Sequence, residues 1–278
     1  MTEDYASSKY TVSAYFAMVD FLRRSKKYPE AQTLLDTLDK LYSSKHPEIV
    51  PEILYDRAVL CGEVKDHKNM LKALEKLTLQ HASSALAPQA FFLLGDLQML
   101  RGEYKAALSA FQQAHERSGG GAFAFCCLGR TADAAFALYS VSREAQYLRQ
   151  ATEGYENLLK VNDLPSELYV QTLYKYGRCL NEVGNKAGAL HCYRKLLYSA
   201  LLDKQQNRYY SLHWSAKALD AALKLLGAEI RQEKDERKIL ALYDEGVYLL
   251  NVARVLGLDN EDIETRLQAL QKLRRKAE

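Results

Sequence analysis

The segment that decides the fold covers residues 91–114 and has the sequence FFLLGDLQMLRGEYKAALSAFQQA. Its apolar residues recur at steps of three and four, which is the period of one buried face of an α-helix. Gly95 is followed twelve residues later by Ala107, and Phe111 comes next in the same frame. Residues 101–103 carry a glycine and two charges, which favours a turn between two helices.

The same spacing returns in four other parts of the chain. A close copy contains Gly177, Ala189 and Tyr193, and looser copies contain Val19, Ala31 and Leu35, then Ala58, Met70 and Leu74, then Tyr139, Ala151 and Tyr155. The residues equivalent to Gly95 are separated by 39, 37, 44 and 38 positions. We assign the extra length of the 44-residue interval, about two helical turns, to a lengthened first helix from Ala122 to Ser142.

Each copy predicts a helical hairpin. Small residues allow two antiparallel helices to touch, and a larger side chain four residues further on fills the space beside them. The small residues are Gly95, Gly177, Ala107 and Ala189. Prolines are tolerated in the first turn of a helix, and all five prolines are predicted to mark helix starts: Pro29, Pro47, Pro51, Pro88 and Pro165. No two-residue alternation typical of a strand appears, so the chain is predicted to be all-α.

The spacing ends near residue 203. We therefore predict five hairpins in residues 1–203 and an extension of longer helices in residues 204–278, continuous with the hairpins. Helices are expected at about 206–232 and 234–256, followed by a final helix that Asp259 caps. The apolar stripe of that helix, Ile263, Leu267, Leu270 and Leu273, would cover the last repeat.

These residues and spacings resemble the tetratricopeptide repeat (TPR) family over about 190 residues. The pattern aromatic-x-x-Leu-Gly, Gly-x-Tyr-x-x-Ala, Phe-x-x-Ala is matched fully in residues 91–114. The resemblance implies a right-handed superhelical solenoid of antiparallel helix pairs with a C-terminal helical cap. His81–Gly95 is also similar to repeats of bacterial cell-envelope TPR proteins of the outer-membrane-assembly lipoprotein and Tol-Pal coordinator type.

An aromatic residue stands three positions before each Gly95 equivalent. The five are Phe16, Tyr55, Phe92, Phe136 and Tyr174. In TPR proteins this position faces the concave groove, so the resemblance implies an aromatic strip along a channel for an extended segment or a helix. The alternative is that each ring packs on the neighbouring repeat and is mostly buried. A ring can also do both, by burying its body and exposing an edge.

Polar residues further along the first helices are candidates for the same groove. They are Asp20, Arg23, Arg24, Asp96, Arg143, Arg178, Asn181 and Glu182. Arg143 and Arg178 could pair with carboxylates of a partner, and the alternative is that these charges are solvated or paired within the chain. The Lys and Asn set with which chaperone-binding TPR domains hold a C-terminal carboxylate is not matched, so that activity is not predicted.

A second contact surface is predicted where Tyr209, Tyr210 and Trp214 cluster, because Tyr and Trp are enriched where binding energy concentrates. Core packing beneath the terminal helices is the alternative.

Composition and the remaining motifs exclude several other classes. The chain has 278 residues with 38 Lys and Arg against 35 Asp and Glu, a net charge of +3 that is far from the basic footprint of a nucleic-acid binder. We find no apolar run of the about 18 to 20 residues that a membrane span requires. Gly119–Gly121 lacks the Lys-Ser/Thr pair of a phosphate loop and is predicted to be a turn.

The titratable residues suggest no reactive centre. No HExxH and no CxxC pair is present, so neither a metal, a cofactor nor a catalytic site is predicted. The five cysteines are interpreted as reduced, mostly buried thiols, which favours a reducing compartment.

The predicted function is a non-catalytic scaffold that binds a peptide or helix of a partner protein in the concave groove. Two alternatives stay open. The chain could be the soluble part of a longer cell-envelope protein acting in outer-membrane or periplasmic assembly, or a regulatory subunit of an enzyme. The expected localisation depends on which function holds. It is cytoplasmic for the sequence as it stands and periplasmic if a signal peptide has been removed.

Overall fold

The described part of the chain, residues 9–277 of a computed structural model, contains helices, short connections and no strand. The elements are α2 (Lys9–Arg24), α3 (Tyr28–Tyr42), the 3-10 helix η1 (Pro47–Ile49), α4 (Val50–Glu63), α5 (His67–Gln80), α6 (Ala87–Leu100), α7 (Tyr104–Arg117), α8 (Gly121–Ser142), α9 (Ala145–Leu159), α10 (Ser166–Glu182), α11 (Lys186–Gln205), α12 (Leu212–Ile230), α13 (Glu236–Leu256) and α14 (Asn260–Ala277). The all-α prediction is confirmed.

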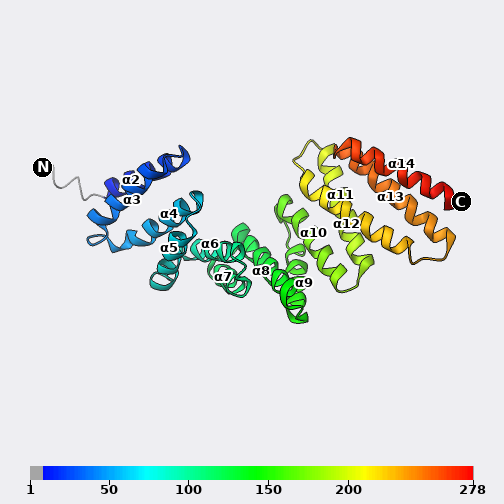
Figure 1. The fold of residues 1–278 in the computed structure, drawn as a ribbon. Coiled ribbons are helices and arrows are strands. Elements are labelled where there is room, and N and C mark those ends of the chain that lie inside the picture. Colours follow the sequence, from blue (N-terminus) through cyan, green and yellow to red (C-terminus); the bar gives the residue numbers. More distant parts are fainter. Residues whose placement is uncertain (1–8, 278) are drawn as a thin grey trace. The chain divides into compact units, whose positions relative to one another are not determined.

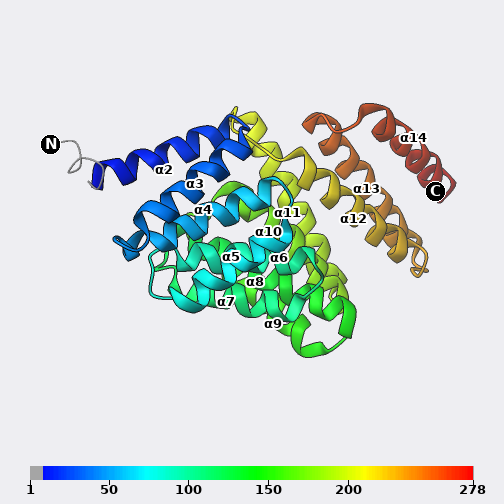
Figure 2. The same cartoon turned by 60° about the vertical axis from the view of Figure 1, so that its left-hand side comes forward.

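The chain divides into two compact units, Met1–Cys127 and Leu128–Glu278, with the boundary inside α8. The first unit contains the antiparallel pairs α2/α3, α4/α5 and α6/α7 (Figure 1), and the α2/α3 pair is clearest in Figure 2. The second unit contains α9, the pairs α10/α11 and α12/α13, and α14. The predicted division between residues 203 and 204 stays a prediction.

In the hairpins α6/α7 and α10/α11, a glycine of the first helix faces a ring of the second, as the spacing predicts. A Cβ atom added to Gly95 would lie 2.6 Å from Cε1 of Phe111, a ring that is fully buried. A Cβ atom added to Gly177 would lie 2.6 Å from Cε1 of Tyr193. Both distances are shorter than any ordinary carbon contact. The two helices of each pair therefore approach closely because these positions have no side chain.

The turn between the two helices of each hairpin contains one residue in the left-handed conformation. These residues, with their φ angles, are Lys26 (59°), Lys65 (61°), Gly102 (75°), Arg143 (58°) and Gly184 (87°). Glycine adopts this conformation without steric cost, whereas other residues pay about 1 kcal/mol or more. Only Gly102 and Gly184 carry this signal in their residue type, so the sequence does not reveal that all five turns share it.

Short polar side chains start several helices. Asp66 accepts a hydrogen bond from the backbone N–H of Asn69 (3.1 Å), and Asn185 accepts one from the N–H of Gly188 (2.9 Å). The expected cap at Asp259 is confirmed, because its carboxylate accepts from the N–H of Glu261 at 3.2 Å. These bonds satisfy N–H groups that have no partner within a helix. The five prolines lie at helix starts, as predicted.

The register predicted for the fourth hairpin is wrong. α8 spans Gly121–Ser142, so the lengthened first helix is confirmed, but Tyr139 does not face Tyr155. The hydroxyl of Tyr155 instead donates to Asp133, and a Cβ atom on Gly154 would lie 3.0 Å from the Cβ of Ala132. Ala132 and Asp133 therefore contact Gly154 and Tyr155 of α9, and the extra turns of α8 follow this contact. Phe136, the position three before Tyr139, comes after the contact rather than before it, so it is not equivalent to Phe92. α8 contains several alanines and glycines, so spacing alone does not select one.

α8 is also the one helix in residues 9–277 that is long and apolar enough, by length and composition, to cross a membrane. A core helix of a helix stack passes the same test. In α8, the ring of Phe123 packs on Phe92 of α6 at a centroid distance of 5.4 Å. The carboxylate of Asp133, also in α8, accepts hydrogen bonds from side chains of α9 and α10.

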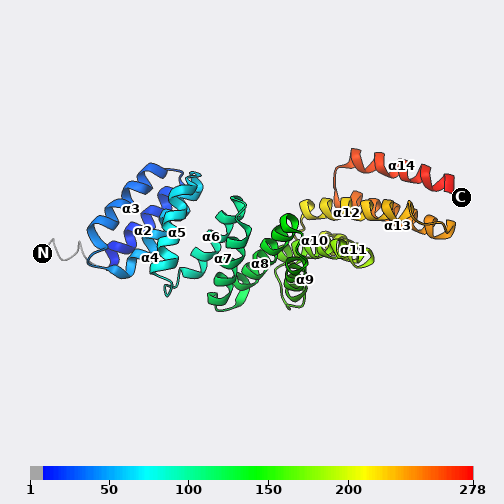
Figure 3. The same ribbon diagram turned by 60° about the horizontal axis from the view of Figure 1, so that its bottom comes forward.

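The C-terminal helices differ from the prediction at one end. α12 begins at Leu212 rather than near residue 206, because the hydroxyl of Ser211 caps it. Tyr209 and Tyr210 therefore precede the helix. α14 lies alongside α13 (Figure 3), and its Arg266 binds Asp220 of α12 at 2.6 Å. The predicted stripe of α14 is buried at Ile263 and Leu267, half-buried at Leu270 and exposed at Leu273.

All five cysteines are free thiols, as expected. Cys61, Cys127, Cys179 and Cys192 are buried, and Cys126 is partly buried. Burial raises the pKa of the Cys127 and Cys179 thiols to about 12 and that of the Cys192 thiol to about 11. At neutral pH these side chains are therefore un-ionised and behave as small apolar groups.

The close contact at Gly95 makes a prediction about stability. Gly95→Ala is expected to lower the free energy of unfolding by about 1–2 kcal/mol, because the clash with the fixed Phe111 ring outweighs the better helix propensity of Ala. Gly129→Ala is the matched control: its Cβ atom would meet Leu158 at an ordinary 3.5 Å. The control should be neutral or gain up to about 1 kcal/mol. Urea denaturation measures both, and equal effects of the two variants would contradict the packing argument.

Candidate functional site

In the second unit, aromatic rings and cations lie close together on α8, α10 and α12. Tyr174 of α10 lies 5.9 Å from Tyr193 and 5.5 Å from Trp214 of α12, between ring centroids. Arg178 follows Tyr174 by one helical turn, and its guanidinium stands 4.5 Å from the centre of the Phe136 ring of α8. Neighbouring rings and cations therefore link α8, α10 and α12.

We name this surface the aromatic–cation strip and define it by Phe136, Tyr139, Arg143, Tyr174, Arg178, Trp214 and Lys217. The ammonium group of Lys217 lies 4.7 Å from the centre of the Trp214 ring and 5.9 Å from that of Tyr174. Arg178 and Lys217 are exposed and form no ion pair within the described residues. Their positive charges rest on ring faces and are available to a partner.

Other charges of this region are paired, and these pairs hold the strip in place. Glu182 accepts from the hydroxyl of Tyr139 at 3.1 Å and from the guanidinium of Arg143 at 3.3 Å. The indole N–H of Trp214 donates to Glu167 at 2.9 Å. Arg143, which was predicted for the groove, lies in the turn between α8 and α9, and its guanidinium is paired with the carboxylate of Glu182. Asn181, also predicted for the groove, is exposed.

A half-buried carboxylate joins the three helices α8, α9 and α10. Asp133 of α8 accepts from the hydroxyl of Tyr155 of α9 at 2.5 Å and from the ammonium of Lys175 of α10 at 2.7 Å. Burial and the nearby Asp133 charge raise the pKa of Tyr155 well above its usual value, so the phenol stays protonated and remains a donor. Sequence spacing did not identify Asp133, because its partners come from different hairpins.

The first unit carries the other three predicted rings, and all three are half-buried. Phe92 packs on Phe111 at 5.5 Å between centroids, and Phe16 packs against the cluster around Leu38. Tyr55 packs against the cluster around Leu54. Each ring therefore combines burial of its body with partial exposure. Whether these rings contact a partner stays a prediction.

The predicted groove charges of the first unit are paired with one another. Asp20 binds Arg23 at 2.6 Å and Arg24 at 2.7 Å, and Arg23 also binds Glu63 of α4 at 2.6 Å. Hydrogen bonds from Arg23 and then Arg24 lower the pKa of Asp20. Asp96 is half-buried on α6. The alternative of charges paired within the chain therefore describes Asp20, Arg23 and Arg24.

Asp56 of α4 is a titratable group that the sequence analysis missed. Burial, and next the charge of Glu52, raise the pKa of its carboxyl to about 6, although Arg23 opposes the shift. The carboxyl is therefore neutral in mild acid and charged above neutral pH, where its burial destabilises the folded state. Asp56 follows Tyr55 directly, so it has no place in the spacing that selected the aromatic row.

The predicted second surface is divided in the structure. Trp214 belongs to the aromatic–cation strip through its contact with Tyr174. The hydroxyl of Tyr210 donates to the backbone carbonyl of Leu256 at 2.9 Å and holds the end of α13. Tyr209 is 74% exposed. Part of the cluster therefore packs on the helices beside it, as the alternative expected, and a contact role for these residues stays a prediction.

No group of three or more His, Cys, Asp or Glu side chains within residues 9–277 is arranged to hold a metal ion.

No protein-family model matches the sequence, and no curated protein is significantly similar to it. Among solved structures the chain is similar to MamA, with 16% identity over 69% of this chain and 97% of that chain and a TM-score of 0.53. It is similar to the C-terminal part of a TPR repeat-containing protein from Cytophaga hutchinsonii, with 15% identity over 94% and 97% of the two chains and a TM-score of 0.50. It is also similar to a chain of the APC/C hetero-tetramer Cut9-Hcn1, with 14% identity over 96% of this chain and 44% of that chain and a TM-score of 0.52.

These neighbours are TPR repeat proteins. At such low identities the similarity establishes the fold alone, and the fold is that of a TPR-type helical solenoid. The likeness to the lipoprotein and Tol-Pal coordinator type stays a prediction.

The raised pKa of Asp56 predicts a specific pH dependence of stability. Because the folded state keeps the proton to higher pH than the unfolded state, stability falls as pH rises from about 4 to about 6. Asp56→Asn is therefore expected to raise the free energy of unfolding by about 1–2 kcal/mol at pH 7.5, and the gain should disappear below pH 4. Thermal denaturation across this range measures it.

Asp20→Asn is the control of opposite sign. The pKa of Asp20 is lowered by its arginine partners, so this variant should not be stabilised at pH 7.5. A gain for Asp56→Asn that persists unchanged at pH 3.5 would contradict the titration argument.

Proposed function

We propose that this chain is a non-catalytic scaffold and that its aromatic–cation strip binds an acidic segment of a partner protein. The proposal rests on one observation: Arg178 and Lys217 are exposed, stand over aromatic rings and have no carboxylate partner within the described residues. A TPR-type fold, whose stacked helices form extended surfaces, is compatible with this role.

The strip supplies both parts of a binding interaction. Aromatic side chains bury large apolar area at low entropic cost, and carboxylates of the partner would select the surface through the two cations. The planar guanidinium of Arg178 is suited to a bidentate contact with a carboxylate. Trp214 and Tyr174 are fixed by the Glu167 hydrogen bond and by each other. A pre-organised surface loses less entropy when it binds.

Charge reversal of the strip tests the proposal. Proteins recovered on the immobilised wild-type chain are identified, and the recovered partner is then titrated against Arg178→Glu/Lys217→Glu. We expect the dissociation constant to rise by at least about tenfold, because two attractive contacts become repulsive. Affinity for the wild type should also fall as the salt concentration rises. Both side chains are exposed, so the variant should fold, as circular dichroism can check.

Lys186→Glu/Arg231→Glu is the matched control, since both residues are exposed, lie outside the strip and give the same change in net charge. Its affinity should equal that of the wild type. Equal weakening by the two double variants would indicate a general charge effect, and no weakening by Arg178→Glu/Lys217→Glu would reject the strip as the binding surface.

The two alternatives from the sequence remain predictions. An upstream signal peptide in the gene would favour the cell-envelope role and a periplasmic location. Co-purification with an enzyme whose rate changes on binding would favour the regulatory-subunit role.

A further inference from the structure

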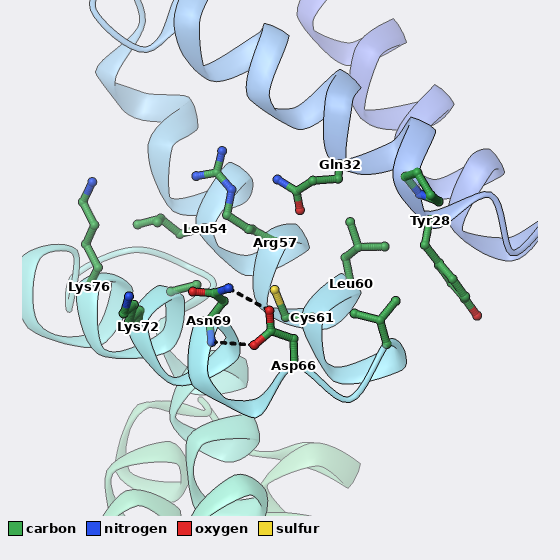
Figure 4. Close-up of a pocket in the computed structure, with 13 residues that line it drawn as sticks. Tyr28, Gln32, Leu54, Arg57, Leu60, Cys61, Asp66, Asn69, Lys72 and Lys76 are labelled. Atoms are coloured by element: carbon green, nitrogen blue, oxygen red, sulfur yellow. Dashed lines mark hydrogen bonds between the residues drawn. The ribbon is translucent and has the colours of Figure 1, made fainter.

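A groove in the first unit lies between α3, α4 and α5 and is separate from the predicted aromatic row. Its volume is about 580 Å³, which is enough for a few side chains of a bound peptide. Figure 4 shows Tyr28 and Gln32 of α3 on one side, Asn69 and Lys72 of α5 on the other, and Cys61 of α4 between them.

The groove uses the opposite side of α4 from the one that carries Tyr55. Leu54, Arg57 and Cys61 line the groove and recur at three and four residues, so they form one face of the helix. At 3.6 residues per turn, Tyr55 and Glu63 lie on the other face, and Glu63 bonds Arg23 of α2. A ligand in the groove would therefore not compete for the predicted aromatic row of this unit.

The lining combines an apolar floor with a basic wall. Leu54, Cys61 and Ala73 form buried parts of the lining, and Val64 at the end of α4 is 47% exposed. Lys72 and Lys76 stand on the α5 side, and both are exposed without an ion pair within the described residues. Lys68, one turn earlier on the same helix, extends this row of positive charge.

The opposite wall carries two carboxylates that one arginine neutralises in part. The guanidinium of Arg57 binds Asp36 at 2.7 Å and Asp39 at 3.2 Å, both on α3. Asp66 at the end of the groove is used as the cap of α5 and accepts two hydrogen bonds from Asn69. Lys72 and Lys76 form no ion pair with these acids within the described residues, so the cations open to a ligand lie along α5.

We propose that this groove is a second docking site, for a protein segment that carries carboxylates beside apolar side chains. The apolar side chains would cover Cys61, Ala73 and Val64, and the carboxylates would lie along Lys72 and Lys76. Charge complementarity selects this occupant, because a basic or neutral segment would leave the two lysines without partners.

The test uses a defined probe in a chain whose strip is disabled. A fluorescein-labelled dodecapeptide with the repeat Glu-Leu-Ser-Glu is titrated by fluorescence anisotropy into the full chain carrying Arg178→Glu/Lys217→Glu. Binding to this background is expected, and adding Lys72→Glu/Lys76→Glu should weaken it by at least about tenfold. The outcome is thus independent of whether the strip binds the partner of the proposed function.

Two further variants locate the site. Val64→Asp should weaken binding by about threefold or more, since it replaces an exposed apolar contact with a repelling charge. Lys105→Glu/Lys186→Glu, at two exposed lysines outside the groove, should leave affinity unchanged. Amide chemical shifts of Val64 and Ala73 should move when the peptide is added.

Three results would overturn the proposal. They are equal affinity of the groove double variant and its background, equal binding of a peptide in which Gln replaces Glu, or shifts confined to residues outside the groove. Sedimentation of the chain without peptide covers one other occupant: self-association that Lys72→Glu/Lys76→Glu abolishes would assign the groove to a second copy of this chain instead.

Discussion

Two central hairpins, α6/α7 and α10/α11, depend on a close contact between a glycine of one helix and an aromatic ring of the other. At Gly95 and Gly177 the absent Cβ atom leaves the space that Phe111 and Tyr193 occupy. This contact sets the distance between the two helices of a hairpin. It thereby also fixes which face of the first helix is left on the surface. Tyr174 stands on that face three residues before Gly177 and also touches Tyr193. The packing contact and the surface ring are therefore parts of one arrangement.

Charge supports this arrangement differently in the two units. In the second unit, Asp133 and Glu182 are already paired with side chains of the chain itself, whereas Arg178 and Lys217 remain on ring faces. In the first unit, Arg23 is neutralised by the carboxylate of Asp20. Asp56 adds a carboxyl group whose charged form is destabilised by burial. A partner that selects by charge would thus distinguish the two rows.

Local patterns in the sequence were sufficient for the helices and most hairpin contacts, because each depends on residues close in one hairpin. They failed where several residues satisfy the same pattern, as with Ala132 and Tyr139 in α8. Lys26, Lys65 and Arg143 show that a left-handed turn need not contain glycine. The stacking of Trp214 on Tyr174 and the groove beside Lys72 depend on distances between hairpins, which residue spacing does not contain.

The four buried cysteines have a practical consequence. Their un-ionised, enclosed sulfur atoms react slowly with alkylating agents while the chain is folded. Cys61 belongs to the first unit, and Cys179 and Cys192 belong to the second. Alkylation at each position, followed by mass spectrometry, would therefore report how often that half opens. The native cysteines are therefore built-in probes of local unfolding, and they report on each of the two units separately.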